Sequence, residues 1–281
     1  MYSPPADPAD GARMLDALTI ATNALGAAPA GPVLWGWAGR TVSRRTDRPD
    51  GGQSWLRLMS APTAQAGGKL WEGNRSAQQA FGALAGHRPQ LLDLHDWTDG
   101  PYSYRAELSQ YVPDDICSPT PALNGALDLP DQWWTSLRHS LETVARAETD
   151  RVAVRQEWAD RAVPRELGIP APALGPLVAV HGDLHWANLT RQGPRLLDWE
   201  GWGLGPACYD QAMLHIYTLS TPDAAKRVRV EFPELDSPQG LVAETVVTTE
   251  LLQSIARGDF AELADAVNGQ ADRLRAAHGQ E

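Results

Sequence analysis

Apolar and polar residues alternate in several short segments of the first 112 residues of the chain. The alternation is clearest at residues 54–59, where Leu56 and Leu58 occupy one face of an expected strand and Trp55 and Arg57 occupy the other. This part of the chain is therefore predicted to form a small antiparallel sheet, preceded by a disordered, Pro-rich segment at residues 1–10. Further strands are expected at 33–37, 41–43, 90–94 and 102–112, and helices at 12–25 and 70–84.

From residue 113 onwards, the spacing of apolar residues changes to that of helices. Trp134, Leu137, Leu141 and Val144 repeat every three or four residues, which places them on one face of a helix that begins at Asp131. The fold class is thus α+β, with a smaller domain at residues 1–112 and a larger, mainly helical domain at residues 113–281. Further helices are expected at 152–162, 211–219, 238–256 and 260–277, and a strand at 177–180.

The composition narrows the class of protein. The chain has 281 residues and only two cysteines, Cys117 and Cys208, which are too few for a disulfide framework. Residues 1–8 lack the basic and apolar regions of a secretory signal. No run of about 18 apolar residues occurs that would span a membrane. We expect a cytoplasmic protein with no membrane partner.

The net charge of −11 is unevenly distributed along the chain. Residues 1–112 contain ten Lys and Arg against ten Asp and Glu, whereas residues 113–281 contain fourteen against twenty-five. An acidic field of this kind disfavours nucleic acid as a partner and favours a cationic ligand. A solvated acidic surface on the helices explains the same excess equally well, so both interpretations stay open.

The residues with the strongest chemical implication follow the strand expected at 177–180. They read His181-Gly182-Asp183-Leu184-His185-Trp186-Ala187-Asn188, and a second apolar run ends at Asp198. The spacing from Asp183 to Asn188 is that of a kinase catalytic loop. Phosphoryl transfer needs one carboxylate to orient the acceptor hydroxyl and take its proton, and oxygen ligands for magnesium. We therefore interpret Asp183 and Asn188 as catalytic and Asn188 and Asp198 as ligands of Mg²⁺, although an ordinary turn closed by Asp183 has the same pattern.

This octapeptide, with Leu197-Asp198-Trp199-Glu200 and Gly205-Pro206-Ala207-Cys208-Tyr209-Asp210 downstream, resembles the aminoglycoside phosphotransferase family. The resemblance is close over the second part of the chain and extends to the first third in outline. It implies a bilobed, protein-kinase-like fold, in which a small antiparallel-sheet N-lobe binds ATP or GTP and a larger C-lobe carries the catalytic loop and the acceptor site. It also implies that His181 and Asp210 brace the loop by hydrogen bonds.

For the nucleotide site, the resemblance implies that Arg57 replaces the strand lysine of kinases, because Lys69 and Lys226 lie outside the expected strands. It assigns to Trp55, on the same face as Arg57, a stacking contact with adenine, with core packing as the alternative. In the helix that follows, Glu72 is the acid expected to pair with Arg57.

Two further segments belong to the implied nucleotide site. Gly36 and Gly39, at the turn of the first hairpin, permit close approach of the backbone to phosphates, and a plain hairpin is equally consistent with them. Ser109, Gln110 and Tyr111 lie in the expected hinge, whose backbone hydrogen-bonds the adenine.

The sequence therefore predicts an enzyme that transfers the γ-phosphoryl group of ATP or GTP, with Mg²⁺, to a hydroxyl group of a small cationic molecule, either aminoglycoside-like or an amino-alcohol metabolite. Two alternatives stay open: a Ser/Thr kinase acting on a biosynthetic peptide, and a pseudokinase binding module. The missing strand lysine favours the pseudokinase, and the intact Asp183, Asn188 and Asp198 oppose it. Acidic residues in the helical tail form a pool of possible contacts to the cation: Glu231, Glu234, Asp236, Glu244 and Glu250.

Overall fold

The computed structural model describes residues 3–279 and divides the chain into two compact units. The first unit contains the described residues up to Gln78 together with Pro89–Pro113, and the second contains Gln79–Arg88 and the described residues from Asp114 onwards. The sequence assigns residues 79–88 to the first domain. In the structure they belong to the second unit, because the ring of Phe81 packs against Trp199 and Trp202 at centroid distances of 4.7 and 4.8 Å.

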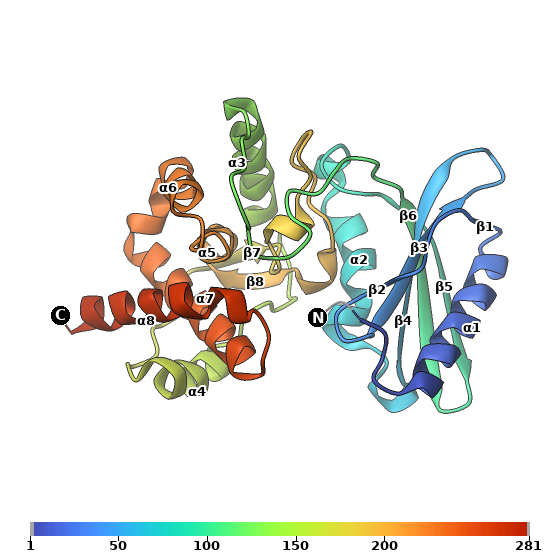
Figure 1. Cartoon of the computed structure of the whole chain (residues 1–281), viewed down its shortest axis with the longest axis horizontal. Coiled ribbons are helices and arrows are strands. Elements are labelled where there is room, and N and C mark those ends of the chain that lie inside the picture. Colours follow the sequence, from blue (N-terminus) through green and yellow to red (C-terminus); the bar gives the residue numbers. More distant parts are fainter. Residues whose placement is uncertain (1–2, 280–281) are drawn as a thin grey trace. The chain divides into compact units, whose positions relative to one another are not determined.

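The first unit is built on an antiparallel sheet (Figure 1). Its strands lie in the order β1-β3-β4-β6-β5, and β2 also pairs with β3. The register of β4 and β6 places Trp55 opposite Ser109 and Arg57 opposite Glu107. The expected strands are all present among the described residues, and β3 and β5 extend further than predicted. The strands are β1 (Ala28–Pro29), β2 (Leu34–Trp35), β3 (Thr41–Asp47), β4 (Gln53–Pro62), β5 (Leu91–Asp99) and β6 (Tyr102–Gln110).

Two helices cover opposite faces of this sheet (Figure 1). They are α1 (Pro8–Ala24) and α2 (Gly68–Ala80). Met14 and Leu18 of α1 pack on Leu56 and Leu58 of β4 in the core of the unit. The other face carries charged side chains, and Arg105 there donates to the carbonyl oxygen of Trp71 in α2 at 2.7 Å. The alternation in β4 therefore separates an apolar core from a polar face, as predicted.

The first helix begins earlier than the sequence suggests. Asp7 is its N-cap, and the Asp7 side chain accepts a 2.8 Å hydrogen bond from the backbone N–H of Ala9. Pro8 occupies the first helical position, where its fixed φ is favourable and its missing N–H costs nothing. The predicted disordered segment is therefore wrong for residues 8–10, and its residues 1–2 lie outside the described part of the chain.

The second unit is mainly helical. Its helices are α3 (Asp131–Ala145), α4 (Gln156–Leu167), α5 (Tyr209–Ile216), α6 (Pro222–Glu231), α7 (Pro238–Ala256) and α8 (Ala264–His278). A two-stranded antiparallel ribbon joins β7 (Leu177–Val180) to β8 (Gly203–Pro206). Helix α7 packs against α4, α5 and α8. Within residues 3–279, none of the helices combines the length and the apolar character needed to cross a bilayer.

Helix α4 begins later than predicted. Residues 152–154 belong instead to the edge of the β7–β8 ribbon, where Val152 forms a bridge with Leu204. The backbone N–H groups of Ala153 and Val154 both donate to the Leu204 carbonyl oxygen, at 2.8 and 3.1 Å. The helix therefore starts at Gln156, after this segment has been held against the ribbon.

A buried ion cluster joins the helices of the second unit. Glu244 of α7 is 1% exposed and contacts His215 Nδ1 at 2.9 Å, Arg229 and Arg273. Burial acts to raise the pKa of Glu244, but the hydrogen bond from His215 and the charges of the two arginines lower it. This acid, expected in the pool of cation contacts, is thus occupied inside the protein and cannot bind an acceptor.

Candidate functional site

The loop after β7 is held by the carboxylate of Asp210 at the start of α5. Asp210 accepts hydrogen bonds from the backbone N–H groups of His181 (2.7 Å) and Gly182 (3.0 Å). Burial raises the pKa of this carboxyl to about 6, although the two hydrogen bonds oppose the shift. The bracing of the loop by Asp210 is confirmed.

Gly182 lies where no side chain fits. Its φ is +80°, and a Cβ atom at this position would lie 2.6 Å from the carbonyl oxygen of Gly201. Protein kinases carry arginine after the first histidine of this motif, which this close approach excludes. The glycine therefore allows the backbone before Asp183 to pack directly on the segment that follows Asp198.

His181 connects the loop to the segment that carries Asp198. Its ring is buried, lies edge-on to Trp199 at 4.7 Å, and its Nε2–H donates to the carbonyl oxygen of Leu197 at 2.9 Å. Burial lowers the pKa of His181 to about 3, so the ring is neutral at pH 7. The N–H of Leu197 donates in turn to the carbonyl oxygen of Asn188 at 2.9 Å. These bonds fix the position of Asp198 relative to the loop.

Asp183 and Asn188 are in direct contact. The Nδ2 group of Asn188 donates to the Asp183 carbonyl oxygen at 2.9 Å and to its carboxylate Oδ2 at 3.2 Å. His185 Nε2 lies 3.6 Å from the other carboxylate oxygen of Asp183. Burial lowers the pKa of His185 to about 4, although the charge of Asp198 opposes the shift. The Asp183 side chain is 41% exposed and that of His185 is 7% exposed, so Asp183 is the more accessible of the two groups.

Asn188 and Asp198 offer the oxygen donors that Mg²⁺ prefers. Because Asn188 donates its amide N–H to Asp183, its Oδ1 points away from that carboxylate. The negative charge of Asp198 acts to raise the pKa of His185, against the effect of burial. Within residues 3–279, no three His, Cys, Asp or Glu side chains form a metal-binding group. Magnesium needs only one or two protein ligands when phosphates and waters complete its shell, so the donor set fits.

A cavity of about 250 Å³ adjoins the loop. A Cβ atom on Gly182 would lie 3.5 Å from the Cβ of Ala153, which lines this cavity together with Val154, Arg155, Trp158 and Glu250. The hydroxyl of Tyr209 donates to Glu250 Oε2 at 2.6 Å. Burial raises the pKa of Tyr209 well above its usual value, and the charges of Glu250 and Asp183 add to the shift. Glu250 is therefore the acid of the expected pool that lies in a cavity beside the loop.

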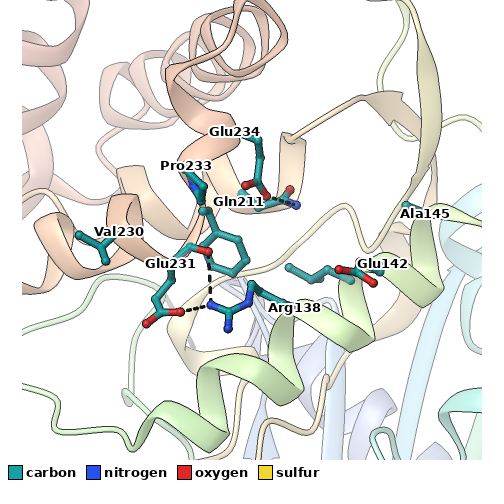
Figure 2. A pocket seen from close by; sticks show the side chains of 10 residues that line it. Arg138, Glu142, Ala145, Gln211, Val230, Glu231, Pro233 and Glu234 are labelled. Atoms are coloured by element: carbon teal, nitrogen blue, oxygen red, sulfur yellow. Dashed lines mark hydrogen bonds and ion pairs between the residues drawn. The ribbon is translucent and has the colours of Figure 1, made fainter.

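A second cavity, of about 480 Å³, lies among α3, α5, α6 and the turn that follows α6 (Figure 2). None of its lining residues belongs to the loop at residues 181–200. Arg138 enters it from α3 and contacts the carboxylate and the carbonyl oxygen of Glu231 (Figure 2). Gln211 donates to Glu234 at 3.4 Å. Two acids of the expected pool are therefore engaged by neighbouring side chains, and a third, Asp236, forms an ion pair with Arg229 at 2.6 Å.

In the first unit, Arg57 lies beside a buried carboxylate. Its Nη1 is 3.3 Å from Oε2 of Glu107, the residue directly opposite on β6. The same oxygen accepts a 2.6 Å hydrogen bond from Nδ2 of Asn74 in α2. The side chains of Glu107 and Arg57 are 1% and 14% exposed. Sequence reasoning missed Glu107, although its place in the alternating segment 104–108 puts it on the polar face with Arg105.

The expected pair between Glu72 and Arg57 is wrong. Glu72 instead lies 3.0 Å from Nη1 of Arg105, which also binds Asp96 at 2.7 Å. Burial acts to lower the pKa of Arg105, but Asp96 and Glu72 together raise it. Asn74 and Glu72 are two positions apart on α2, about 200° around the helix axis, so the two side chains meet different residues of the sheet.

The glycines of the first hairpin have a local explanation. A Cβ atom on Gly36 would lie 2.0 Å from Thr41 Oγ1, and one on Gly39 would lie 2.4 Å from the backbone nitrogen of Pro5. Gly39 also has a φ of +69°. The close approach that these glycines permit is thus made by the chain itself, and a phosphate contact at this turn stays a prediction.

The expected hinge lies partly inside the sheet. Ser109 pairs with Trp55 and Leu91, and the N–H of Gln110 donates to the carbonyl oxygen of Gln90 at 2.8 Å. The Gln110 N–H is therefore not a donor for adenine. Tyr111 follows the strand, and its ring stacks on Trp55 at a centroid distance of 6.4 Å and an interplanar angle of 27°. An adenine contact at this aromatic pair stays a prediction.

The sequence matches the model of the phosphotransferase enzyme family (APH) over residues 2–240. The chain belongs to this family. No curated protein matches the sequence. Two solved structures are similar in fold. An amicoumacin kinase in complex with AMP-PNP, Ca²⁺ and Ami has a TM-score of 0.57 at 10% identity, with 94% of this chain and 96% of that chain covered. A macrolide 2'-phosphotransferase from Brachybacterium faecium has a TM-score of 0.54 at 16% identity, with 94% and 98% covered.

The family and the fold decide the class of the protein. The predicted α+β, protein-kinase-like fold is confirmed, and so is the predicted class of enzyme, a phosphotransferase. Membership of an enzyme family opposes the pseudokinase alternative.

Proposed function

We propose that this phosphotransferase moves the γ-phosphoryl group of ATP or GTP, bound with Mg²⁺, to a hydroxyl group of a small cationic molecule. The observation that carries the proposal is the contact between Asp183 and Asn188, together with the bond from His181 to the Leu197 carbonyl oxygen before Asp198 and a cavity with a carboxylate, Glu250, that adjoins the loop. The AMP-PNP and Ca²⁺ in the amicoumacin kinase of similar fold support the use of a nucleotide with a divalent cation.

The reaction needs one proton transfer and one displacement at phosphorus. The Asp183 carboxylate accepts the proton of the acceptor hydroxyl while the hydroxyl oxygen bonds to the γ-phosphorus. The bond between the γ-phosphorus and the β,γ-bridging oxygen breaks, and the nucleoside diphosphate leaves. Asn188 orients the carboxylate through its 3.2 Å hydrogen bond to Oδ2. Asn188 and Asp198 would hold Mg²⁺, which would supply positive charge at the nucleotide phosphates. Arg57 would add positive charge at the phosphate oxygens.

Two residues of the cavity beside the loop support a cationic acceptor, whereas Arg155 of the same lining carries the opposite charge. Glu250 contributes a carboxylate, whose position is fixed by the 2.6 Å hydrogen bond from Tyr209, and Trp158 contributes an aromatic ring. An ammonium group is attracted both by a carboxylate and by the face of an indole ring. The acidic excess of residues 113–281 adds a long-range field that concentrates cations near this unit.

The proposal is tested by measuring nucleoside diphosphate release with a panel of acceptors at saturating Mg-ATP and Mg-GTP. The panel contains aminoglycosides, amino alcohols, neutral polyols and peptides with Ser or Thr. We expect turnover with cationic acceptors, an acceptor KM that rises with ionic strength, and loss of turnover in Asp183→Asn. The absence of nucleotide binding at millimolar concentration would refute the proposal, and turnover with peptides alone would identify the peptide kinase instead.

The acceptor contact has its own variant and control. Glu250→Gln keeps an oxygen that accepts from Tyr209 but removes the charge, so the KM for a cationic acceptor should rise about tenfold, on the order of one lost charge-assisted contact. Glu157→Gln removes an exposed carboxylate of α4 outside the cavity lining and should leave this KM unchanged. Equal KM values in the two variants would mean that the general field, and not Glu250, attracts the acceptor.

A further inference from the structure

Arg57 forms an ion pair with a carboxylate of the adjacent strand. Glu107 is the cross-strand neighbour of Arg57, and the two side chains meet through Nη1 and Oε2 at 3.3 Å. In protein kinases, by contrast, the acid that pairs with the strand cation lies on the helix above the sheet. The helix of this chain contributes an amide at this place, Asn74, whose Nδ2 donates to the same Glu107 oxygen at 2.6 Å.

The burial of Glu107 makes this arrangement specific. At 1% exposure, its carboxylate has lost its water shell and must be compensated by charged and polar neighbours. Among the described residues, these neighbours are Arg57 and Asn74, which both bind Oε2, whereas Oε1 has no hydrogen-bond partner. A shift of Arg57 away from Glu107 would therefore expose the full cost of the buried charge, so the carboxylate limits the positions that the guanidinium can adopt.

We propose that Glu107 is a positioning residue that holds the guanidinium of Arg57 in the orientation that binds the nucleotide phosphates, and that Asn74 fixes Glu107 for this task. The inference rests on the proposed function, in which Arg57 contacts the phosphates. Glu107 itself touches neither the nucleotide nor the acceptor. Its effect is transmitted through Arg57, so it depends on the presence of phosphates in the ligand and on the presence of Arg57 in the protein.

These two conditions distinguish positioning from a merely structural role. Glu107→Gln keeps the size of the side chain and an oxygen that accepts from Asn74, but it removes the charge that fixes Arg57. Binding of Mg-ATP should weaken about tenfold or more, and kcat should fall by up to about 100-fold, as expected for a displaced electrostatic group. Binding of adenosine, which lacks phosphates, should be unchanged. A structural defect of the sheet would weaken the binding of both ligands together.

The experiment measures the dissociation constants of Mg-ATP and adenosine by calorimetry, and kcat with a cationic acceptor, for the full-length protein. It uses the parent, Glu107→Gln, Arg57→Gln, the double variant, and Asp96→Asn. Asp96 pairs with Arg105 on the same sheet and serves as a matched control, because it is a carboxylate bound to a different arginine. We expect Glu107→Gln to weaken Mg-ATP binding in the parent background and to have no further effect on it in the Arg57→Gln background. We expect Asp96→Asn to bind Mg-ATP as tightly as the parent.

Each contrary outcome has a defined meaning. Equal Mg-ATP affinity in the parent and in Glu107→Gln would overturn the inference, as would equal weakening of adenosine binding or additive effects of the two substitutions. If Glu107→Gln does not fold, Asn74→Ala replaces it, since loss of the Asn74 hydrogen bond should change the ratio of the two dissociation constants in the same direction. If the parent turns over acceptor and Glu107→Gln has the same nucleotide affinity and kcat as the parent, only the inference about Glu107 is refuted. A parent that binds no nucleotide refutes it together with the proposed function.

Discussion

Replacement of Gly182 by alanine tests the geometry of the catalytic loop most directly. At a φ of +80°, an L-residue pays roughly 1–2 kcal/mol for a left-handed backbone. The new Cβ would also lie 2.6 Å from the carbonyl oxygen of Gly201, and overpacking of this kind costs roughly 1–3 kcal/mol. We therefore expect Gly182→Ala to lower the free energy of unfolding by roughly 2–5 kcal/mol, which corresponds to a melting temperature lower by roughly 5–20 °C.

The same substitution should affect catalysis. The backbone must move to relieve the contact, and Gly182 is the residue before Asp183. A displacement of about 1 Å in the catalytic carboxylate costs on the order of 100-fold in kcat. The assay is urea unfolding followed by tryptophan fluorescence, together with kcat at saturating nucleotide and acceptor.

Gly201→Ala is the matched control for this prediction, because it adds the same methyl group to the other side of the same contact. Its Cβ would lie 3.4 Å from the carbonyl oxygen of Gly182, an ordinary van der Waals distance, and its φ is not left-handed. It should change stability by less than about 1 kcal/mol. If Gly182→Ala is as stable and as active as Gly201→Ala, the loop does not pack on Gly201 as described.

Three further predictions concern charged groups. Asp198→Asn should weaken the binding of Mg-ATP while leaving the melting temperature within a few degrees, and unchanged affinity in calorimetry would exclude Asp198 as a metal ligand. Arg57→Met should lower the free energy of unfolding by roughly 3–5 kcal/mol, because it leaves the Glu107 carboxylate buried without its cation. Arg57→Met/Glu107→Gln should recover most of this loss in urea unfolding, and no recovery would mean that the pair is not coupled. Burial raises the pKa of Asp210 to about 6. In the folded protein, Asp210 therefore keeps its proton at pH values where the unfolded chain releases it. The stability of the parent relative to Asp210→Asn should therefore fall by on the order of 3 kcal/mol as pH rises from about 4 to 6, and a difference independent of pH would contradict the raised pKa.

The sequence was most informative where a local pattern determines structure. The alternation around Trp55 and Arg57 identified both the strand and its polar face, because residues two apart in a strand point to the same side. The octapeptide ending at Asn188 predicted that Asp183 and Asn188 lie in one loop, because the chemistry requires these residues at fixed spacing, and the two side chains are in contact. In contrast, Asp198 has a left-handed backbone with a φ of +59°, which is uncommon outside glycine and which no neighbour in the sequence indicates.

The sequence alone does not predict which side chains pair across the sheet. Glu107 is 50 residues from Arg57, and their contact depends on the register of β4 and β6, which no short turn sets. The choice between Glu72 and Asn74 depends on the rotation of α2 about its axis, and sequence spacing alone leaves that rotation undetermined. The late start of α4 likewise results from hydrogen bonds to Leu204, about 50 residues away.

Arg57 and Glu107 lie on adjacent strands, so their ion pair does not depend on the position of a helix. Protein kinases are switched by swinging a helix, because that movement breaks the pair between the strand cation and the helix acid. Here, displacement of α2 would remove one amide hydrogen bond and leave the ion pair intact, since backbone hydrogen bonds between β4 and β6 keep its two members together. A ligand that pulled α2 outward would attenuate turnover without abolishing it.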